Sequence, residues 1–509
     1  MDLNDIDEQP EFRVTFSPNL YLQRRGWVLD QLRREHVTQV LDVGCGEGEL
    51  LACLCQPAPW LPPPPSNSLP NADTESTSRC TGPFSCAHSE SFYPVPNTLP
   101  DKIANLHPSH LAGLDVSPHD LQFAVLGTAP KPPSHWNENV RWEALEVKLW
   151  QGGLESLNEE FVGVECITAM EVYVCAPIPF EFNLSSSCDR IEHLPEHILP
   201  DFAPVLLGVY HPRLLLVTTP NFTFNARFHP PDTPESRVGG YPDPTGRTDR
   251  IFRHHDHKFE WVVEEFTEWC ASVADEWGYT VEVAGIGKAV EPDEWGRDEE
   301  LGYASQVAKF KRIEGEPRQD ARTKKAMKVV KRASKQTKHE LIKTHRYDAH
   351  PQARHPLSLD EIGEAVKAKM QEFRQAVTRL EELWFENDIA VMCGGWLEFL
   401  IAAVDQHKDL KMMRKEGRGR AEWRVELLGG VHEEPEPFWG ECEQDEWESE
   451  ENAAEDGTVD DKSETGSVPG WGAPCGAGED GPAESQESGW ARGSGWGSTE
   501  AHGDSGTGW

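Results

Sequence analysis

The chain has 509 residues, of which 38% are hydrophobic, and its formal net charge is −39. This length allows two or three domains, and the low hydrophobic fraction predicts that part of the chain lies outside any packed core. No apolar run of about 18 residues occurs, and no basic segment precedes an apolar stretch at the start, so we expect no membrane span and no secretory signal.

The alternation of short apolar segments with helix-like segments is the main fold signal in residues 1–315. We expect buried strands at 37–44, 111–117, 161–170, 213–221 and 279–287. Such strands, separated by amphipathic segments, predict βαβ units and therefore an α/β fold with a mostly parallel sheet and helices on both faces. Within this domain, residues 57–100 are rich in Pro, Ser and Asn, which favours a surface insertion.

Residues 316–430 are expected to form a basic connector and a small helical module. The segment 309–346 is strongly basic, although the whole chain is acidic. Ser358 and Glu361 match a capping box, and we expect helical segments at 361–387 and 394–413 after it. From residue 431 to 509, Gly, Ser, Glu and Asp dominate, so this acidic tail is expected to be disordered.

A glycine-rich turn follows the first expected strand, in the segment VLDVGCGEGELL (40–51). Its glycines are Gly44, Gly46 and Gly48. Residues without a side chain let the backbone turn sharply and approach a ligand closely. Asp42 precedes the turn and Glu47 lies within it, so the turn would repel an anionic pyrophosphate but not a cationic sulfonium.

An acidic residue, Asp115, ends the next expected strand in the segment GLDVS (113–117). A carboxylate at this position suits the diol of a ribose, although a helix cap is an alternative interpretation. We also assign Gly153 to the cofactor-binding residues. With the glycine turn, these residues resemble the class I S-adenosylmethionine-dependent methyltransferases, which implies a Rossmann-like fold and S-adenosylmethionine as the cofactor.

Acidic and imidazole side chains concentrate in two segments, IEHLPEH (191–197) and RHHDHKFEW (253–261). A metal site and a polar surface loop would both account for this composition. The segment AMEV (169–172) closes an expected strand, and joining it directly to the first cluster gives AMEVIEHLPEH. That text, together with TTPN (218–221) and DHKFEW, resembles the small-RNA 3′-terminal 2′-O-methyltransferases of the Hen family over most of residues 14–290.

This resemblance implies transfer of a methyl group from S-adenosylmethionine to the 2′-OH of the 3′-terminal nucleotide of small RNAs. It also implies one divalent ion, Mg or Mn, whose ligands would be the catalytic residues Glu171, Glu192, His193 and His257. An ion that binds the 2′ and 3′ oxygens would lower the pKa of the hydroxyl and align it with the sulfonium. Mixed oxygen and nitrogen ligation suits Mn or Fe better than Mg. Four neighbours are expected at the surface or behind the ligands, with the last near the terminal phosphate: His197, His254, His255 and Arg253.

Residues 173–190 interrupt the pattern between two of the implied ligands. A loop that folds away from the site is one interpretation. We hypothesise instead a retained intron, because codons for Val172–Val174 can hold a splice donor and codons for Asp189–Arg190 a splice acceptor. The excised length is a multiple of three bases. Transcript sequencing across the junction tests this hypothesis, and uniform inclusion in mature message would contradict it.

Six tryptophans lie in the acidic tail, most of them beside glycine. An indole in a solvated chain has no local partner, and spaced indoles suit multivalent docking into pockets of another protein. The pattern resembles the GW/WG Argonaute-binding hooks of small-RNA silencing proteins, and compositional noise is the alternative. The basic connector is likewise interpreted as a track for RNA phosphates or as a solvated helix.

Two other functions stay open at this point. One is a class I methyltransferase with a non-RNA acceptor, which should need neither metal nor RNA. The other is an Argonaute-binding scaffold whose methyltransferase domain is inactive because residues 173–190 are a true insertion. In each case we expect a monomer without membrane contact. The twelve cysteines lack zinc-ribbon spacing, which favours reduced thiols in a cytoplasmic, or also nuclear, protein.

Overall fold

The computed structural model describes residues 12–65, 105–131, 140–170, 191–195, 197–231, 233, 240–333, 338–414 and 422–431. Residues Met1–Glu434 belong to one unit. Within the described ranges, every helix is too short or too polar to cross a membrane.

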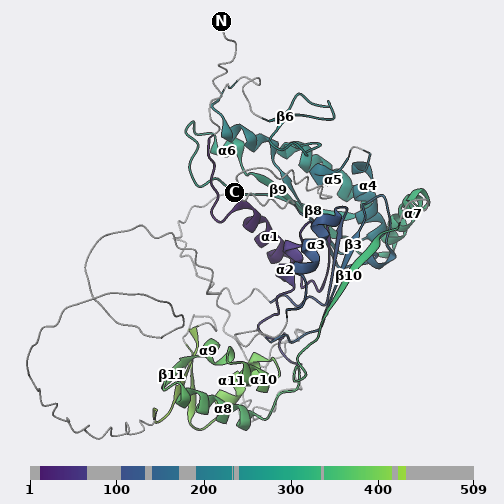
Figure 1. Cartoon of the computed structure of the whole chain (residues 1–509). Helices are drawn as coiled ribbons and strands as arrows, with labels where there is room; N and C mark the ends of the chain where they lie inside the picture. The colour runs from purple at the N-terminus through teal and green to yellow at the C-terminus, as the bar shows by residue number, and fades with distance from the viewer. Residues whose placement is uncertain are drawn as a thin grey trace, which may run out of the picture. The chain divides into compact units, whose positions relative to one another are not determined.

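A central sheet of eight strands organises the first 350 residues. Its strands are β1 (Gln39–Val43), β2 (His110–Asp115), β3 (Leu145–Gln151), β4 (Cys166–Ala169), β5 (Leu214–Pro220), β8 (Tyr279–Ile286), β9 (Ser305–Arg312) and β10 (Glu340–Tyr347). They lie in the order β10-β3-β2-β1-β4-β5-β9-β8 (Figure 1). Neighbours among β1 to β5 are parallel, whereas β9 runs antiparallel to β5 and β8, and β10 antiparallel to β3. The predicted α/β fold with a mostly parallel sheet is therefore confirmed.

Helices cover both faces of this sheet, as expected. They are α1 (Leu20–Arg34), α2 (Glu49–Leu54), α3 (Pro118–Gly127), α4 (Leu199–Ala203), α5 (Val263–Trp277), α6 (Asp298–Leu301) and α7 (Glu316–Ala333), with short helices η1 (Glu159–Phe161), η2 (Ile191–His193), η3 (Pro204–Tyr210) and η4 (Phe222–Phe228). Successive strand residues point to opposite faces. In β5, Leu215 and Val217 pack in the cluster with η3 and α5, whereas Leu214 and Leu216 pack in the cluster with α1, α2 and α3.

The predicted domain boundary at residue 315 is too early, because β10 belongs to the central sheet. Helix α7 confirms the helical part of the connector, but residues 340–347 pair with β3 from Glu340–Gln151 to Tyr347–Leu145. Most residues of this edge strand are exposed, so no apolar alternation marks it in the sequence.

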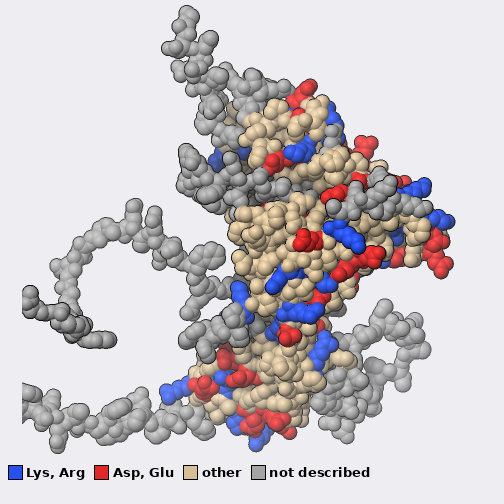
Figure 2. Space-filling model, turned by 45° about the vertical axis from the view of Figure 1, so that its right-hand side comes forward, with Lys and Arg blue, Asp and Glu red and all other residues tan. Residues whose placement is uncertain are grey.

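Two basic side chains of α7 donate hydrogen bonds to backbone carbonyl oxygens of the fold. Arg322 is buried and donates to the carbonyl oxygens of Trp277 (3.0 Å) and Gly278 (3.2 Å), while Lys325 donates to Glu276 O (2.6 Å). Figure 2 shows basic and acidic side chains interspersed over one face of the molecule. The RNA-phosphate track on the connector stays a prediction.

The C-terminal module contains strands as well as helices. Its helices are α8 (Leu359–Glu372), α9 (Leu380–Trp384), α10 (Asn387–Met392) and α11 (Leu397–Gln406), and its sheet has the order β11 (Val377–Arg379), β13 (Arg424–Leu427), β12 (Leu410–Met413). The predicted helical module is therefore incomplete, because it also contains a three-stranded sheet, and the predicted continuous helix 361–387 is wrong. Helix α8 ends before Arg374, whose φ of 53° is left-handed, and the chain then enters β11.

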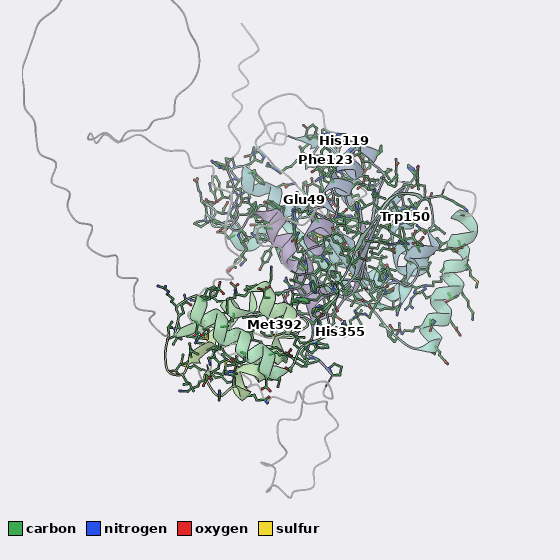
Figure 3. All side chains as sticks on the ribbon, turned by 60° about the horizontal axis from the view of Figure 1, so that its bottom comes forward. Glu49, His119, Phe123, Trp150, His355 and Met392 are labelled. Carbon is green, nitrogen blue, oxygen red and sulfur yellow. The ribbon has the colours of Figure 1, made fainter. Side chains whose placement is uncertain are left out.

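The start of α8 was predicted correctly. Ser358 Oγ accepts the backbone N–H of Glu361 (3.3 Å), and Glu361 Oε2 accepts the backbone N–H of Ser358 (3.0 Å). This reciprocal pair is a capping box. The loop before it is held by Leu357, whose N–H donates to Met392 O (2.8 Å), in the part of the module where Figure 3 labels Met392 and His355.

The first residues of the predicted surface insertion are packed. Leu61 is 1% exposed and lies in the hydrophobic cluster of the C-terminal module. Pro59 O accepts hydrogen bonds from the indoles of Trp142 (3.1 Å) and Trp384 (2.9 Å). The insertion therefore cannot begin at residue 57, and its remainder, 66–100, lies outside the described residues.

Candidate functional site

The strand order reverses at β1, which has β2 on one side and β4 on the other, and sheets of this kind bind ligands in a crevice at the carboxyl ends of the strands at such a point. The glycine turn follows β1 at this point. All three glycines have positive φ, with values of 73° at Gly44, 52° at Gly46 and 77° at Gly48. A Cβ on Gly48 would lie 2.8 Å from the Cβ of Ala124 in α3, so any side chain there would disturb the packing of the turn on α3.

Asp115 connects the glycine turn to the start of α3. Its side chain is fully buried, Oδ2 accepts the N–H of Gly46 (2.7 Å), and Oδ1 accepts the N–H of Ser117 (2.8 Å). The helix cap itself is Ser117, whose Oγ accepts the N–H of Asp120 (3.2 Å). Asp115 therefore fixes the backbone of the glycine turn and the residue before α3. Its hydrogen bond to a ribose stays a prediction.

Asp42 and Gly153 lie on two sides of this crevice. Asp42 is buried and accepts a hydrogen bond from Thr168 Oγ1 (2.6 Å), which ties β1 to β4. Gly153 follows β3, and its carbonyl oxygen lies 2.9 Å from Nε2 of the buried His339. The structure thus brings all six predicted cofactor residues to one edge of the sheet. Sequence reasoning missed His339, which arrives from the loop before β10.

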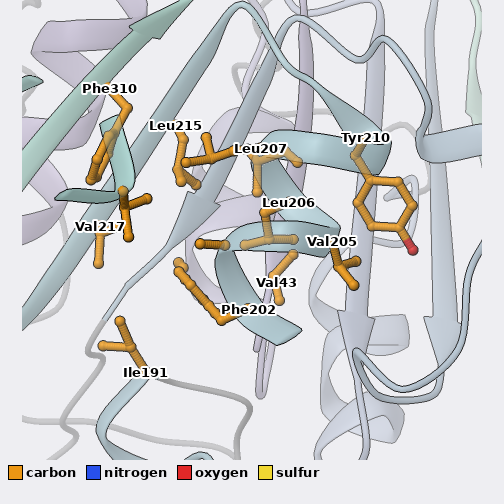
Figure 4. Packing of buried hydrophobic residues seen from close by; sticks show 14 of the residues in the cluster. Val43, Ile191, Phe202, Val205, Leu206, Leu207, Tyr210, Leu215, Val217 and Phe310 are labelled. Atoms are coloured by element: carbon orange, nitrogen blue, oxygen red, sulfur yellow. The ribbon is translucent and has the colours of Figure 1, made fainter. Parts of the chain in front are cut away.

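The acidic and imidazole residues of the first cluster are held in η2. Ile191 is 1% exposed and packs in the main core with Phe202 and Val217 (Figure 4), which anchors the helix. Glu192 is fully buried, and its Oε2 accepts a hydrogen bond from Thr219 Oγ1 at the end of β5 (3.3 Å). Its Oε1 lies 3.9 Å from Nε2 of His193. Glu171 lies outside the described residues.

The second cluster is docked onto the first by a backbone hydrogen bond from Lys258 N to Glu192 O (2.7 Å). As a result, one nitrogen from each of His193, His254 and His257 lies within 4.8 Å of the others. The expected pair of His193 and His257 is therefore brought together, with ring centroids 4.9 Å apart. His254, expected at the surface or behind the ligands, is half-buried and joins them.

The remaining imidazoles differ from His254. His197 and His255 are exposed, as expected. Burial, followed by repulsion from His257 and His255, lowers the pKa of His254 to about 4, so its ring is neutral near pH 7. Arg253 lies with its guanidinium carbon 3.4 Å from the centroid of the Phe228 ring, and its contact with a phosphate stays a prediction.

A buried chain of hydrogen bonds orients His257. Its Nδ1 lies 2.6 Å from Oε1 of Glu260, and Oε2 of Glu260 accepts the side-chain N–H of Asn225 (2.6 Å). Because a carboxylate only accepts, Nδ1 of a neutral His257 carries the proton and Nε2 keeps a lone pair. Sequence reasoning missed Asn225 and Glu260, although Glu260 stands inside the DHKFEW motif.

The donor set fits a divalent ion. Glu192 offers a carboxylate oxygen 3.9 Å from Nε2 of His193, and His193 and His257 offer imidazole nitrogens within 4.8 Å of each other, so oxygen and nitrogen donors lie close together. Such a mixed set favours Mn or Fe over Mg, which prefers oxygen ligands alone.

Comparison with known proteins identifies the relatives of this chain. No family model matches it. The small RNA 2′-O-methyltransferase of Xenopus tropicalis is 31% identical over 220 residues, which are 43% of this chain and 48% of that protein. The chain is similar to the small RNA 2′-O-methyltransferases over about half of its length. The enzyme of Arabidopsis thaliana is 27% identical over 300 residues, which are 58% of this chain and 23% of that protein. The resemblance found from the motifs is therefore confirmed, and the chain spans about a quarter to a half of these relatives.

Two solved structures match this chain with low TM-scores. A crystal structure of small RNA methyltransferase HEN1 matches with a TM-score of 0.39 and 22% identity, covering 67% of this chain and 30% of that chain. The methyltransferase domain of bacterial CtHen1-C matches with a TM-score of 0.34 and 24% identity, covering 58% of this chain and all of that one.

Proposed function

We propose that this relative of the small RNA 2′-O-methyltransferases transfers a methyl group from S-adenosylmethionine to the 2′-OH of the 3′-terminal nucleotide of small RNAs. One observation carries the proposal. Ring nitrogens of His193, His254 and His257 come within 4.8 Å of one another from two distant segments, and Oε1 of the buried Glu192 lies 3.9 Å from Nε2 of His193.

The cofactor half of the site is formed by the turns after β1, β2 and β3. We propose that S-adenosylmethionine binds across these turns. Gly44 and Gly46 have no side chain, so the cofactor can approach the backbone closely there. Asp115 holds the turn in place by accepting the N–H of Gly46. The acidic turn suits the cationic sulfonium, because Glu47 is exposed there. Glu171, directly after the buried end of β4, stands between this half and the ion ligands in the sequence.

The acceptor half consists of Glu192, His193 and His257, with Glu171 as the fourth proposed ligand. A divalent ion bound there would supply a Lewis acid that lowers the pKa of the 2′-OH and fixes both ribose oxygens. Glu192 is oriented for this role by Thr219, and His257 by Glu260. Because a 2′-deoxy end lacks the acceptor oxygen, the arrangement selects RNA over DNA.

Two further features belong to the proposal. The tryptophans of the tail 431–509 would dock Argonaute, although the tail lies outside the described residues. The cysteines that the structure describes are free thiols, which supports a cytoplasmic or nuclear location.

The test is methyl transfer to a short single-stranded RNA with a free 2′,3′ diol, compared with the same RNA ending in a 2′-deoxy nucleotide. Both are measured with chelator and with added Mn, on the full chain and on the chain lacking residues 173–190. Transfer to the diol alone, and only with the ion, is the expected result. The proposal is overturned if methyl transfer occurs without the ion. It is also overturned if neither protein methylates RNA while S-adenosylmethionine still binds. Activity of the shortened chain alone supports the retained-intron hypothesis.

A further inference from the structure

Four aromatic rings run in sequence from the buried ion site to the surface. His257 is 4% exposed, and its ring centroid lies 5.1 Å from that of His254. The His254 centroid lies 4.6 Å from that of His255, with 36° between the ring planes. The His255 centroid lies 5.8 Å from that of Tyr241. The last two side chains are 52% and 48% exposed, so the row ends in solvent.

The hydrogen bonds of His254 exclude it from the ion ligands despite its position beside them. Its Nδ1 accepts the backbone N–H of Asp256 (3.2 Å), so the lone pair of that nitrogen is used. The proton of the ring must then be on Nε2, which leaves no lone pair there to bind a metal. His257 has the opposite tautomer, because Glu260 accepts the proton of its Nδ1. Of these two rings, the hydrogen bonds favour His257 as the proposed ligand and His254 as the first ring beyond it.

The outer end of the row is built by a small hairpin. Its strands β6 (Tyr241–Pro242) and β7 (Ile251–Phe252) pair outside the central sheet, with Tyr241 opposite Phe252. The chain runs from β7 directly into residues 253–257, so the hairpin brings Tyr241 to His255. Asp256 holds the His255 ring through a contact of 3.2 Å between its Oδ2 and Nε2 of the imidazole.

We propose that the rings of His254, His255 and Tyr241 form a stacking track for the last bases of a single-stranded RNA whose terminal ribose lies at the ion site. This inference rests on the proposed function and extends it to substrate recognition. Exposed aromatic rings bind unpaired bases of any sequence, because every base has a π-face. The guanidinium of Arg253, adjacent to the track in the chain, provides a positive charge for the accompanying phosphates.

The test uses the double variant His255→Ala/Tyr241→Ala and measures the KM for RNA, the kcat and the Mn affinity. The substrate is a short single-stranded RNA, compared with the same RNA carrying abasic residues at the two positions before its last nucleotide. The wild-type protein should show a KM about tenfold higher for the abasic RNA, and the variant should show about the same high KM for both RNAs. Its kcat and Mn affinity should match the wild type. His355→Ala/Phe373→Ala, which removes an exposed imidazole and a partly exposed ring from the C-terminal module, is the matched control.

The Mn affinity of a His254 variant tests whether this ring is an ion ligand. His254→Ala should keep the Mn affinity of the wild type within about twofold, whereas a ligand would lose most of it. A wild-type enzyme that methylates intact and abasic RNA with equal KM overturns the track, while the proposed function stands. Loss of Mn binding in His254→Ala also overturns it, because the ring would then be a ligand. Absence of any RNA methylation by the wild-type protein is a failure of the proposed function instead.

Discussion

The two halves of the site are assembled in different ways. In the cofactor half, the glycine turn follows β1 and Asp115 ends β2, and these two strands are neighbours in the sheet. In the acceptor half, residues 191–193 meet residues 253–257 through a backbone bond from Lys258 to Glu192 and through buried side chains. The first half follows from strand order alone, whereas the second depends on a few long-range hydrogen bonds. Substitutions in the cofactor half should therefore change the affinity for S-adenosylmethionine, and substitutions in the acceptor half the affinity for Mn.

The largest effect is expected at His257, which is proposed as an ion ligand. His257→Ala should remove Mn binding and lower RNA methylation by at least about a hundredfold, because the variant loses one imidazole donor. The affinity for S-adenosylmethionine should not change, since no cofactor residue contacts this side chain among the described bonds. Electron paramagnetic resonance of added Mn and calorimetry with the cofactor measure the two affinities. The control is His355→Ala, at an exposed imidazole in the C-terminal module, and Mn binding by His257→Ala would contradict the assignment.

The next effect concerns the orientation of His257. Glu260→Gln should weaken Mn binding about 10- to 100-fold, because an amide cannot accept from both His257 and Asn225. Adding Asn225→Asp should restore part of the affinity, since the new carboxylate accepts the amide proton and leaves the amide oxygen for His257. Mn titration of both variants makes the test. Glu264→Gln, at an exposed residue of α5, is the control, and an equal loss there would mean that net charge rather than geometry is responsible.

A smaller effect is expected in the cofactor half. Asp115→Asn should weaken binding of S-adenosylmethionine about tenfold and lower the free energy of unfolding by about 1–3 kcal/mol, because a buried amide N–H would face the N–H of Gly46 or Ser117. Mn affinity should stay at the wild-type value. Calorimetry with each ligand measures both, and a parallel loss of Mn and cofactor would show that the two halves are not independent.

The smallest effect lies outside both halves, at Glu35. Burial acts to raise the pKa of this carboxyl, but hydrogen bonds from Lys311 (2.8 Å) and Lys309 lower it to about 2. A carboxyl with a lowered pKa in the folded state stabilises the fold above its ordinary pKa of 4.5, and this contribution is lost as the pH falls toward 2. Glu35→Gln should therefore cost about 1 kcal/mol at pH 7 and almost nothing near pH 2. Denaturant unfolding at both pH values measures this, and an equal cost at both would show that packing rather than charge is responsible.

The parts of the fold that the sequence predicted are those with a local signal. Buried strands such as β1 and β5 are short apolar runs, and the capping box at Ser358 needs only four residues. Strand β10 was missed because it is an exposed edge strand with charged residues. The helix predicted over 361–387 failed because its apolar periodicity continues through Val377–Arg379, which pairs with β13 instead.

The site shows the same division. The glycine turn and Asp115 could be placed from strand ends, and the ligands His193 and His257 were named from the family resemblance. The position of His254 could not be predicted, because it depends on the hydrogen bond from Asp256 N and on the docking of Lys258 onto η2. Asn225 and Glu260 act through His257, and no periodic pattern marks residues that only orient a neighbour.

The most direct measurement of the central claim is the position of the methyl group in the product. RNA with a free 2′,3′ diol is incubated with the protein lacking residues 173–190, S-adenosylmethionine and Mn, and its nucleosides are then identified by mass spectrometry. If the proposed reaction is correct, the 2′-O-methyl group will be found on the terminal ribose alone. The same RNA with a 2′-deoxy end will carry no methyl group. Methylation of a base or an internal ribose, or no transfer while both S-adenosylmethionine and Mn bind, would contradict the proposed reaction.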